Sequence, residues 1–182
     1  MSTLTVELQP DALVVLVGVA GSGKSTLAER LFALDQILSS DAFRAEVAGD
    51  PADQSATPEA FRRLHAALEE RLRDGRLTVV DATNVQESAR QQLLAAARRH
   101  GRPTTAIVLA LPVEVALGRN GDRERLVPPS AIRRQDWWLR KSLTGLAGEG
   151  FGQVVMLTTP DKVAALEIRA QRNAPKEQHP VI

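Results

Sequence analysis

The sequence predicts an α/β fold in which a parallel sheet is flanked by helices. Two observations support this prediction: short, almost continuously apolar runs recur along the chain, and helical patterns separate them. Continuous apolar runs are typical of strands that are buried on both faces, and their alternation with helices is typical of a parallel sheet. The five expected strands are Leu13–Val17, Gln36–Ser39, Leu77–Val80, Thr104–Leu111 and Gln153–Leu157.

The composition fits one domain with a sizeable core. The chain has 182 residues, of which 43% are hydrophobic. Its 23 Lys and Arg nearly balance its 22 Asp and Glu, which excludes a uniformly polycationic surface but not a local basic patch. The absence of Cys excludes disulfides, thiolate metal sites and Cys nucleophiles. The longest apolar run is too short to span a bilayer, and Met1–Asp11 contains no basic residue, so a cytoplasmic protein is expected.

Several helix ends can be located from their capping residues. Thr57, followed by Pro58, is expected to cap a helix that ends before Gly75. Asn84 with Glu87 forms an expected capping box for the next helix. Further helices are expected over Ser25–Leu34 and Pro129–Leu146. One domain is expected over residues 1–169, and the polar segment 170–182, which has two prolines, is expected to be a disordered tail.

The segment GVAGSGKST, which starts at Gly18, matches the phosphate-binding motif G-x-x-x-x-G-K-[ST]. It follows an expected strand and opens an expected helix, which is the context that the motif requires. Lys24 is expected to reach the β- and γ-phosphates, and the Ser25 hydroxyl is expected to bind Mg²⁺. These features indicate a P-loop kinase fold. The residues expected to bind ATP or another NTP are Gly21, Ser22, Gly23, Lys24, Ser25 and Thr26.

Two carboxylates follow expected strands, at the sheet edge where ligands of open parallel sheets bind. Asp41 could accept the proton of a hydroxyl acceptor, and Arg44, on the same side of a starting helix, could hold an anionic acceptor. The alternative is that Asp41 caps that helix and Arg44 is solvated. Asp81 occupies a position where an aspartate holds Mg²⁺. For Asn84, the role of helix cap is favoured over a role in this site.

A basic segment towards the C-terminal part of the chain contains Arg119 and Arg123, four residues apart. On a helix they would share a face and could clamp the transferring phosphoryl group. The alternative is an ordinary solvated helix face. Gly121 and the following double proline predict a helical lid over the substrate. The two tryptophans lie in the expected helix beyond; one is expected to pack against the sheet, with stacking on a nucleobase as the alternative.

The segments GVAGSGKST, LSSDAFR, VDATN and RNGDR together resemble the 5′-hydroxyl polynucleotide kinase family, most closely the kinase module of bacterial Pnkp RNA-repair proteins. The resemblance implies Mg²⁺-dependent transfer of the NTP γ-phosphate to the 5′-OH end of RNA or DNA. It implies that Asp41 is the general base, that Arg44 binds the acceptor's neighbouring phosphate and that Gln54 contacts this phosphate. Arg119 and Arg123 would bind the donor phosphates. Phosphatase and ligase modules are implied partners, on the same or another chain.

Two other functions stay open at this point. The same loop, carboxylate and lid would serve a kinase of a small-molecule hydroxyl, such as a sugar, a nucleoside or an antibiotic. A nucleotide-binding regulatory module without acceptor chemistry would need only the phosphate loop. The chain lacks a D-x-D-x-T phosphatase signature, so it is not expected to remove 3′-phosphates.

Overall fold

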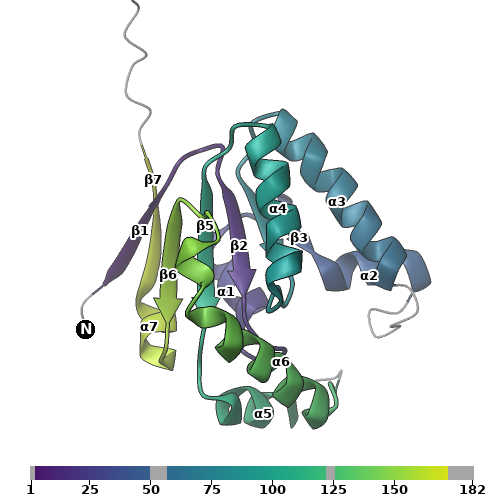
Figure 1. Ribbon diagram of the computed structural model, residues 1–182, viewed down its shortest axis with the longest axis vertical. Coiled ribbons are helices and arrows are strands. Elements are labelled where there is room, and N and C mark those ends of the chain that lie inside the picture. The colour runs from purple at the N-terminus through teal and green to yellow at the C-terminus, as the bar shows by residue number, and fades with distance from the viewer. Residues whose placement is uncertain (1–2, 50–56, 122–125, 172–182) are drawn as a thin grey trace, which may run out of the picture.

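The computed structural model describes residues 3–49, 57–121 and 126–171. It confirms the α/β fold with a five-stranded parallel sheet flanked by helices (Figure 1). The strand order in the sheet is β3-β4-β2-β5-β6. The strands are β2 (Leu13–Val17), β3 (Ile37–Ser39), β4 (Thr78–Asp81), β5 (Thr104–Leu109) and β6 (Gln153–Leu157). Each overlaps one of the expected runs, because residues buried on both faces leave a continuous apolar signal in the sequence.

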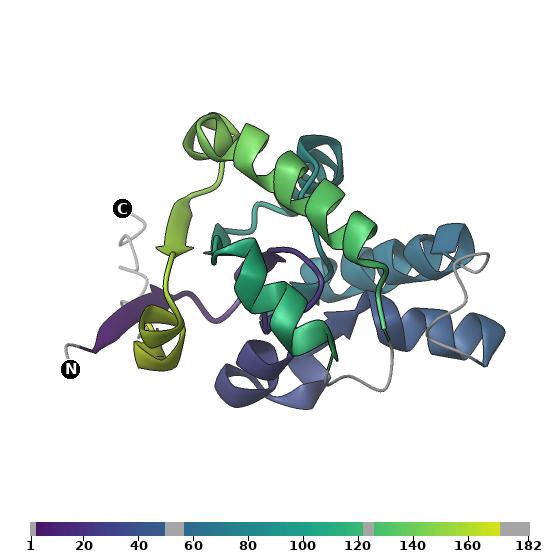
Figure 2. The same cartoon turned by 90° about the horizontal axis from the view of Figure 1, so that it is seen from below.

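Helices cover both faces of the sheet and its carboxyl end. The strand arrows in Figure 1 point towards α5 and α6, and Figure 2 shows these two helices crossing that end of the sheet. The helices are α1 (Lys24–Leu31), α2 (Ser40–Ala48), α3 (Thr57–Arg73), α4 (Glu87–Arg99), α5 (Val113–Gly121), α6 (Pro129–Leu143) and α7 (Pro160–Ala165), with short 3₁₀ turns η1 (Leu34–Gln36) and η3 (Leu146–Gly148). None of the helices within the described ranges is long and apolar enough to cross a membrane.

The side chains of β2 divide the interior into two cores. Val15 and Val17 join a core that includes residues of α3, α4 and α6. Val14 and Leu16 point the other way and join a second core that includes residues of α1. This division follows from the period of two in a strand, which sends successive side chains to opposite faces. The central strand is therefore anchored from both sides, and the loop after it starts from a fixed point.

A second, two-stranded sheet was not expected from the sequence. It consists of β1 (Leu4–Leu8) and β7 (Leu166–Ala170), which pair in parallel. Val6 and Leu8 are each only 2% exposed and belong to the second core. Ala170, at the end of β7, is the first residue of the segment that was expected to be a disordered tail; residues 172–182 lie outside the described part of the chain.

Several expected helix ends differ from the structure, two of them at the start of α3 and the end of α1. Thr57 is itself the first residue of α3, and among the described residues its buried hydroxyl has no hydrogen-bond partner, so it is not the cap. Helix α1 ends at Leu31 rather than at Leu34, because Phe32 has extended backbone angles and the chain continues into a 3₁₀ turn. Both differences concern the local backbone at a helix end, where sequence patterns locate boundaries least well.

Candidate active site

The phosphate loop connects β2 to α1 and depends on its glycines. Gly21 and Gly23 have φ angles of 82° and 97°, a region that favours glycine. A Cβ atom on Gly21 would lie 2.6 Å from the carbonyl oxygen of Ala116 in α5. A Cβ atom on Gly18 would lie 2.8 Å from the Ser22 hydroxyl. The backbone conformation and the close approach of α5 therefore both require glycine in this loop.

Lys24 is the first residue of α1 and is only 7% exposed. Its ammonium group donates a hydrogen bond to the carbonyl oxygen of Val19, at 2.8 Å, and so folds back over the loop. The N-terminus of α1 adds partial positive charge at the same point. Together, the ammonium group and the helix N-terminus form a site with the charge and the N–H donors that a phosphate group needs.

Ser25 and Asp81 meet beside the loop, although they come from different elements. The Ser25 hydroxyl donates a 2.6 Å hydrogen bond to the Asp81 carboxylate, which ends β4 and is 6% exposed. Mg²⁺ is commonly held by one or two protein oxygens, with phosphate oxygens and water completing its coordination. A hydroxyl and a carboxylate next to the phosphate loop fit that requirement, so these two residues could hold the ion.

Asp41 and Arg44 lie one turn apart in α2 and form an ion pair. The cap of this helix is Ser39, whose hydroxyl accepts a hydrogen bond from the N–H of Ala42. The alternative interpretation of Asp41 as a helix cap is therefore wrong. The Asp41 side chain is 45% exposed, whereas that of Arg44 is only 11% exposed. The carboxylate is thus accessible to a ligand, while the guanidinium that pairs with it is largely buried.

Arg119 reaches the phosphate loop from α5. Its guanidinium donates a 3.0 Å hydrogen bond to the carbonyl oxygen of Ser22, next to the positive-φ Gly23. The expected partner Arg123 lies outside the described residues, and so does the predicted substrate residue Gln54. Arg119 is therefore the one of these three predicted residues whose position at the loop can be described.

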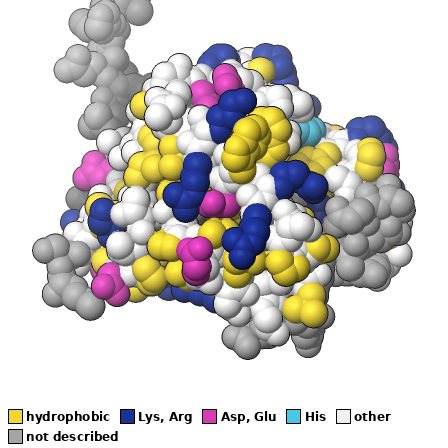
Figure 3. Space-filling model, turned by 60° about the horizontal axis from the view of Figure 1, so that its bottom comes forward, with side chains coloured by type: hydrophobic (Ala, Val, Ile, Leu, Met, Phe, Trp, Pro, Cys, Tyr) yellow, Lys and Arg dark blue, Asp and Glu magenta, His cyan; other side chains and the backbone are white. Residues whose placement is uncertain are grey.

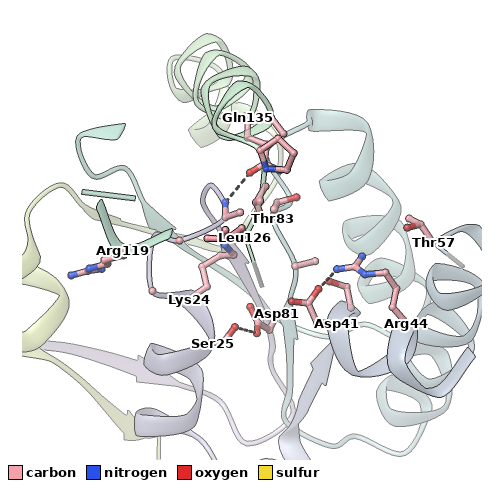
Figure 4. A pocket seen from close by; sticks show the side chains of 18 of the residues that line it. Lys24, Ser25, Asp41, Arg44, Thr57, Asp81, Thr83, Arg119, Leu126 and Gln135 are labelled. Carbon is pink, nitrogen blue, oxygen red and sulfur yellow. Dashed lines mark hydrogen bonds and ion pairs between the residues drawn. The ribbon is translucent and has the colours of Figure 1, made fainter. Parts of the chain in front are cut away.

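Sequence reasoning missed Gln135. This residue of α6 accepts a 2.8 Å hydrogen bond from the backbone N–H of Ala20, inside the phosphate loop (Figure 4). The bond ties the start of the loop to a helix that comes more than a hundred residues later. No spacing rule connects the two positions, and a glutamine in an amphipathic helix gives no functional signal by itself. Only the packing of α6 over the sheet end reveals the contact.

The expectation for Asn84 was wrong. Helix α4 begins at Glu87, and its N-cap residue Gln86 makes no capping side-chain bond. Asn84 is instead buried, has a φ of 48°, and donates a 2.8 Å hydrogen bond to the carbonyl oxygen of Leu16. Asn84 thus fixes the turn after β4 against the end of β2. A local pattern of Asn and Glu could not show this, because the acceptor lies on another strand.

These elements enclose one cavity of about 690 Å³. Figure 4 shows Asp81 beside Ser25, and Asp41 facing the same space from α2. The predicted site residues that line the cavity are Gly21, Gly23, Lys24, Ser25, Thr26, Asp41, Arg44, Asp81 and Arg119. Arg134 and Gln135 of α6 also line it and were not expected. The cavity thus combines a phosphate loop, two carboxylates and three arginines.

A second cavity, of about 410 Å³, lies between α3 and α4 and shares Phe61 with the first. His65 lines it, and burial lowers the pKa of this imidazole below its usual value. His65 is therefore neutral at physiological pH. The positive charge near the site comes from arginine and lysine side chains, not from histidine.

A model of the protein family AAA_33, described as an AAA domain, matches residues 13–141. The chain belongs to this family. The AAA_33 match runs from the first residue of β2 almost to the end of α6, and so includes every element that lines the larger cavity. A kinase-type protein with a nucleotide-binding P-loop is what this match and the fold support.

Several solved structures, two of them described as kinases, share the fold of this chain. A chain of the Pnkp1/Rnl/Hen1 RNA repair complex is 24% identical with a TM-score of 0.64, over 74% of this chain and 46% of that one. A sugar kinase from Janibacter sp. HTCC2649 is 23% identical with a TM-score of 0.53, over 84% of this chain and 89% of that one. A gluconokinase from Sinorhizobium meliloti 1021 is 21% identical with a TM-score of 0.55, over 87% and 90% respectively. At these identities the likeness concerns the fold alone.

Proposed function

We propose that this protein transfers the γ-phosphate of ATP or another NTP to the 5′-hydroxyl end of RNA or DNA. The observation that carries the proposal is the Asp41–Arg44 pair in the same cavity as the phosphate loop. A carboxylate suits a hydroxyl that must lose its proton, and a neighbouring guanidinium suits an acceptor that also carries phosphate. A polynucleotide 5′ end offers both groups next to each other.

Two further observations support a polynucleotide over a neutral acceptor. Four segments of the sequence resemble the polynucleotide kinase family, and the fold is shared with a chain of an RNA repair complex. The present chain spans 46% of that chain. A phosphatase activity, on the same or another polypeptide, would then remove 3′-phosphates, and a ligase activity would join the 5′-phosphorylated ends that this kinase produces.

The donor side of the proposed mechanism rests on the phosphate loop. The backbone N–H groups of residues 21–26 and the Lys24 ammonium would hold the β- and γ-phosphates. Ser25 and Asp81 would hold Mg²⁺, which neutralises charge on the phosphate oxygens when it is bound. Arg119, already hydrogen-bonded to the loop, would neutralise charge on the transferring group together with Arg123.

The acceptor side requires a rearrangement of the Asp41–Arg44 pair. Asp41 pairs with Arg44, so an arriving acceptor phosphate would redirect the guanidinium and leave the carboxylate facing the 5′-hydroxyl. The hydroxyl oxygen then forms a bond to the γ-phosphorus while the bond from phosphorus to the bridging oxygen breaks. The nucleoside diphosphate leaves, and the hydroxyl proton passes to Asp41.

The test is label transfer from γ-labelled ATP to a 5′-OH oligonucleotide. Asp41→Asn should lower the transfer rate roughly a hundredfold to ten-thousandfold, which is the usual contribution of a general base. Asp161→Asn, an exposed carboxylate in α7, is the matched control and should leave the rate unchanged. Equal transfer by wild type and Asp41→Asn would remove Asp41 from the mechanism.

A panel of acceptors separates the polynucleotide from small molecules. Arg44→Ala should reduce transfer to an oligonucleotide far more than transfer to a neutral sugar, because only the oligonucleotide has a phosphate for Arg44. If the wild type hydrolyses ATP and phosphorylates sugars or gluconate but no oligonucleotide, the protein is a small-molecule kinase. That alternative is favoured by the two sugar-acid and sugar kinases that match over most of their own length.

A further inference from the structure

The outer face of α6 carries a group of basic side chains around an exposed tryptophan. The basic residues are Arg133, Arg134, Arg140 and Lys141, all exposed, and Trp137 lies between them. With about 100° of rotation per residue in an α-helix, these five side chains fall within an arc of about 120° whose centre is Trp137. We call this group the α6 strip. Two carboxylates of the described residues lie near it: Asp136 is paired with Arg140, and Glu114 of α5 also attracts Arg140.

Trp137 is exposed but its ring is held in place. It is 54% exposed, although it is one of the largest apolar side chains in the protein. The ring of Trp138, which is partly buried against the first core, meets it edge to face, with centroids 4.7 Å apart and planes at 75°. The ammonium of Lys141 lies 5.1 Å from the Trp137 ring centroid. The Trp137 ring is therefore an exposed aromatic surface with a fixed orientation and basic side chains around it.

The α6 strip begins at the wall of the active-site cavity. Arg134, at one edge of the strip, lines that cavity, and so does its neighbour Gln135. Figure 3 views the end of the molecule that carries α5 and α6, where Lys and Arg side chains stand around exposed hydrophobic side chains. A ligand that leaves the cavity past Arg134 would reach Trp137 about one helical turn further along α6.

We propose that the α6 strip binds the acceptor strand beyond its 5′-terminal nucleotide. This inference rests on the proposed function, because it presumes a polynucleotide acceptor. Single-stranded nucleic acid is bound by basic side chains that follow its backbone and by aromatic rings on which its bases stack. Arg133, Arg134 and Lys141 supply the first feature, and Trp137 supplies the second. Stacking and phosphate contacts predict binding that depends on strand length and salt but little on base sequence.

The test measures binding and transfer separately. A fluorescently labelled 5′-OH oligonucleotide of about 12 nucleotides is titrated with protein, and its anisotropy gives the dissociation constant. Trp137→Ala should weaken binding about tenfold, and Trp137→Phe should restore most of it. The loss should be smaller for a dinucleotide acceptor, which has fewer nucleotides beyond its 5′ end to contact the strip than a 12-mer has. Leu34→Ala, which removes a side chain that is 77% exposed and far from α6 in the chain, is the matched control.

The salt dependence tests the basic residues of the strip. Arg133→Ala should reduce the slope of log binding constant against log salt by about one. Arg73→Ala, an exposed arginine at the end of α3, should leave that slope unchanged. Thermal unfolding of each variant verifies that the fold is intact, and all these positions are exposed.

The outcomes distinguish this inference from the proposed function. Undiminished oligonucleotide binding by Trp137→Ala, with efficient transfer by the wild type, overturns the inference and leaves the function in place. A Trp137→Ala effect confined to the KM for ATP would assign the ring to the donor nucleobase and overturn the inference. If the wild type neither binds nor phosphorylates any oligonucleotide, both proposals fail.

Discussion

Asn84 shows how much of the site depends on one residue in an uncommon conformation. Its φ of 48° lies in the region that favours glycine, yet its buried side chain holds the Leu16 carbonyl at the end of β2. Asparagine tolerates this backbone better than most residues, because its short polar side chain can compensate by a hydrogen bond. The turn after β4, and with it the neighbourhood of Asp81, is thus fixed to the strand that leads into the phosphate loop.

Two substitutions of Asn84 separate the hydrogen bond from the strain. Asn84→Gly and Asn84→Ala both leave the buried Leu16 carbonyl without its side-chain donor, which costs about 1–3 kcal/mol of unfolding free energy. Alanine adds roughly 1 kcal/mol more, because its Cβ is unfavourable at positive φ. Urea unfolding should therefore rank wild type above Asn84→Gly and Asn84→Gly above Asn84→Ala. An alanine variant as stable as the glycine variant would show that the turn relaxes to another conformation.

The positions of most described site residues followed from the sequence, because each lies just after a strand or within the motif. Parallel strands end at the same edge of the sheet, so Lys24, Asp41 and Asp81 had to lie near one another there. The Gln135 contact with Ala20 and the Asn84 contact with Leu16 could not be predicted. Each contact joins residues that are far apart in the chain. A glutamine in a helix and an asparagine in a turn are both common, so neither residue indicates such a contact by its type.

At the scale of secondary-structure elements, α4 is joined to its neighbours by a buried ion pair. Arg90 is fully buried and donates hydrogen bonds to both carboxylate oxygens of Glu149, which lies just after η3. The same guanidinium donates a 2.8 Å bond to the carbonyl oxygen of Asn84. One side chain of α4 therefore connects the segment before β6 to the turn that follows β4.

Breaking this pair from one side should be strongly destabilising. Glu149→Ala leaves the Arg90 charge buried without its carboxylate, which typically costs about 3–5 kcal/mol. Chemical denaturation should show this loss, while Arg73→Ala, which breaks a weaker exposed pair, should cost no more than about 1 kcal/mol. In the double variant Arg90→Met/Glu149→Ala the loss should be smaller than in Glu149→Ala, because no charge stays buried alone. A double variant that is less stable than Glu149→Ala would contradict this account.

The elements differed in how well the sequence predicted them. The five central strands were recognisable because both of their faces are buried and their residues are almost all apolar. β1 and β7 were not recognised, because their apolar residues alternate with the exposed Thr5, Glu7 and Arg169 and do not form the continuous apolar run that marked the other strands. Their pairing also joins opposite ends of the described chain, and no local signal identifies such a distant partner.

At the scale of the whole molecule, the small sheet completes the second core. Val6, Leu8 and Leu166 pack with residues of α1 and with Val14 and Leu16 of the central strand. The two sheets are separate in their hydrogen bonding but share this apolar interior. The segment before the phosphate-loop domain is therefore part of the folded unit, even though the family match begins only at residue 13.

Leu8→Ala tests that statement. Leu8 is 2% exposed, and its truncation should lower the free energy of unfolding by about 2–5 kcal/mol, as for other buried leucines. A single cooperative transition in thermal unfolding should persist, because the small sheet and the main sheet share one core. Leu34→Ala, at a side chain that is 77% exposed, should change stability by less than about 0.5 kcal/mol. If the variant lost the pairing of β1 with β7 but kept its global stability, the small sheet would not be part of the cooperative folding unit.

The parallel pairing of β1 with β7 also determines how the protein would respond to a mechanical load. The chain enters β1 at Leu4, opposite Leu166, and leaves β7 at Ala170, opposite Leu8. Opposed pulling at residues 3 and 171 would therefore slide the two strands past each other instead of peeling them apart. The evenly spaced hydrogen bonds of a parallel ladder would then bear the load together. The small sheet would therefore resist a force that pulls residues 3 and 171 apart, because its hydrogen bonds would have to break together.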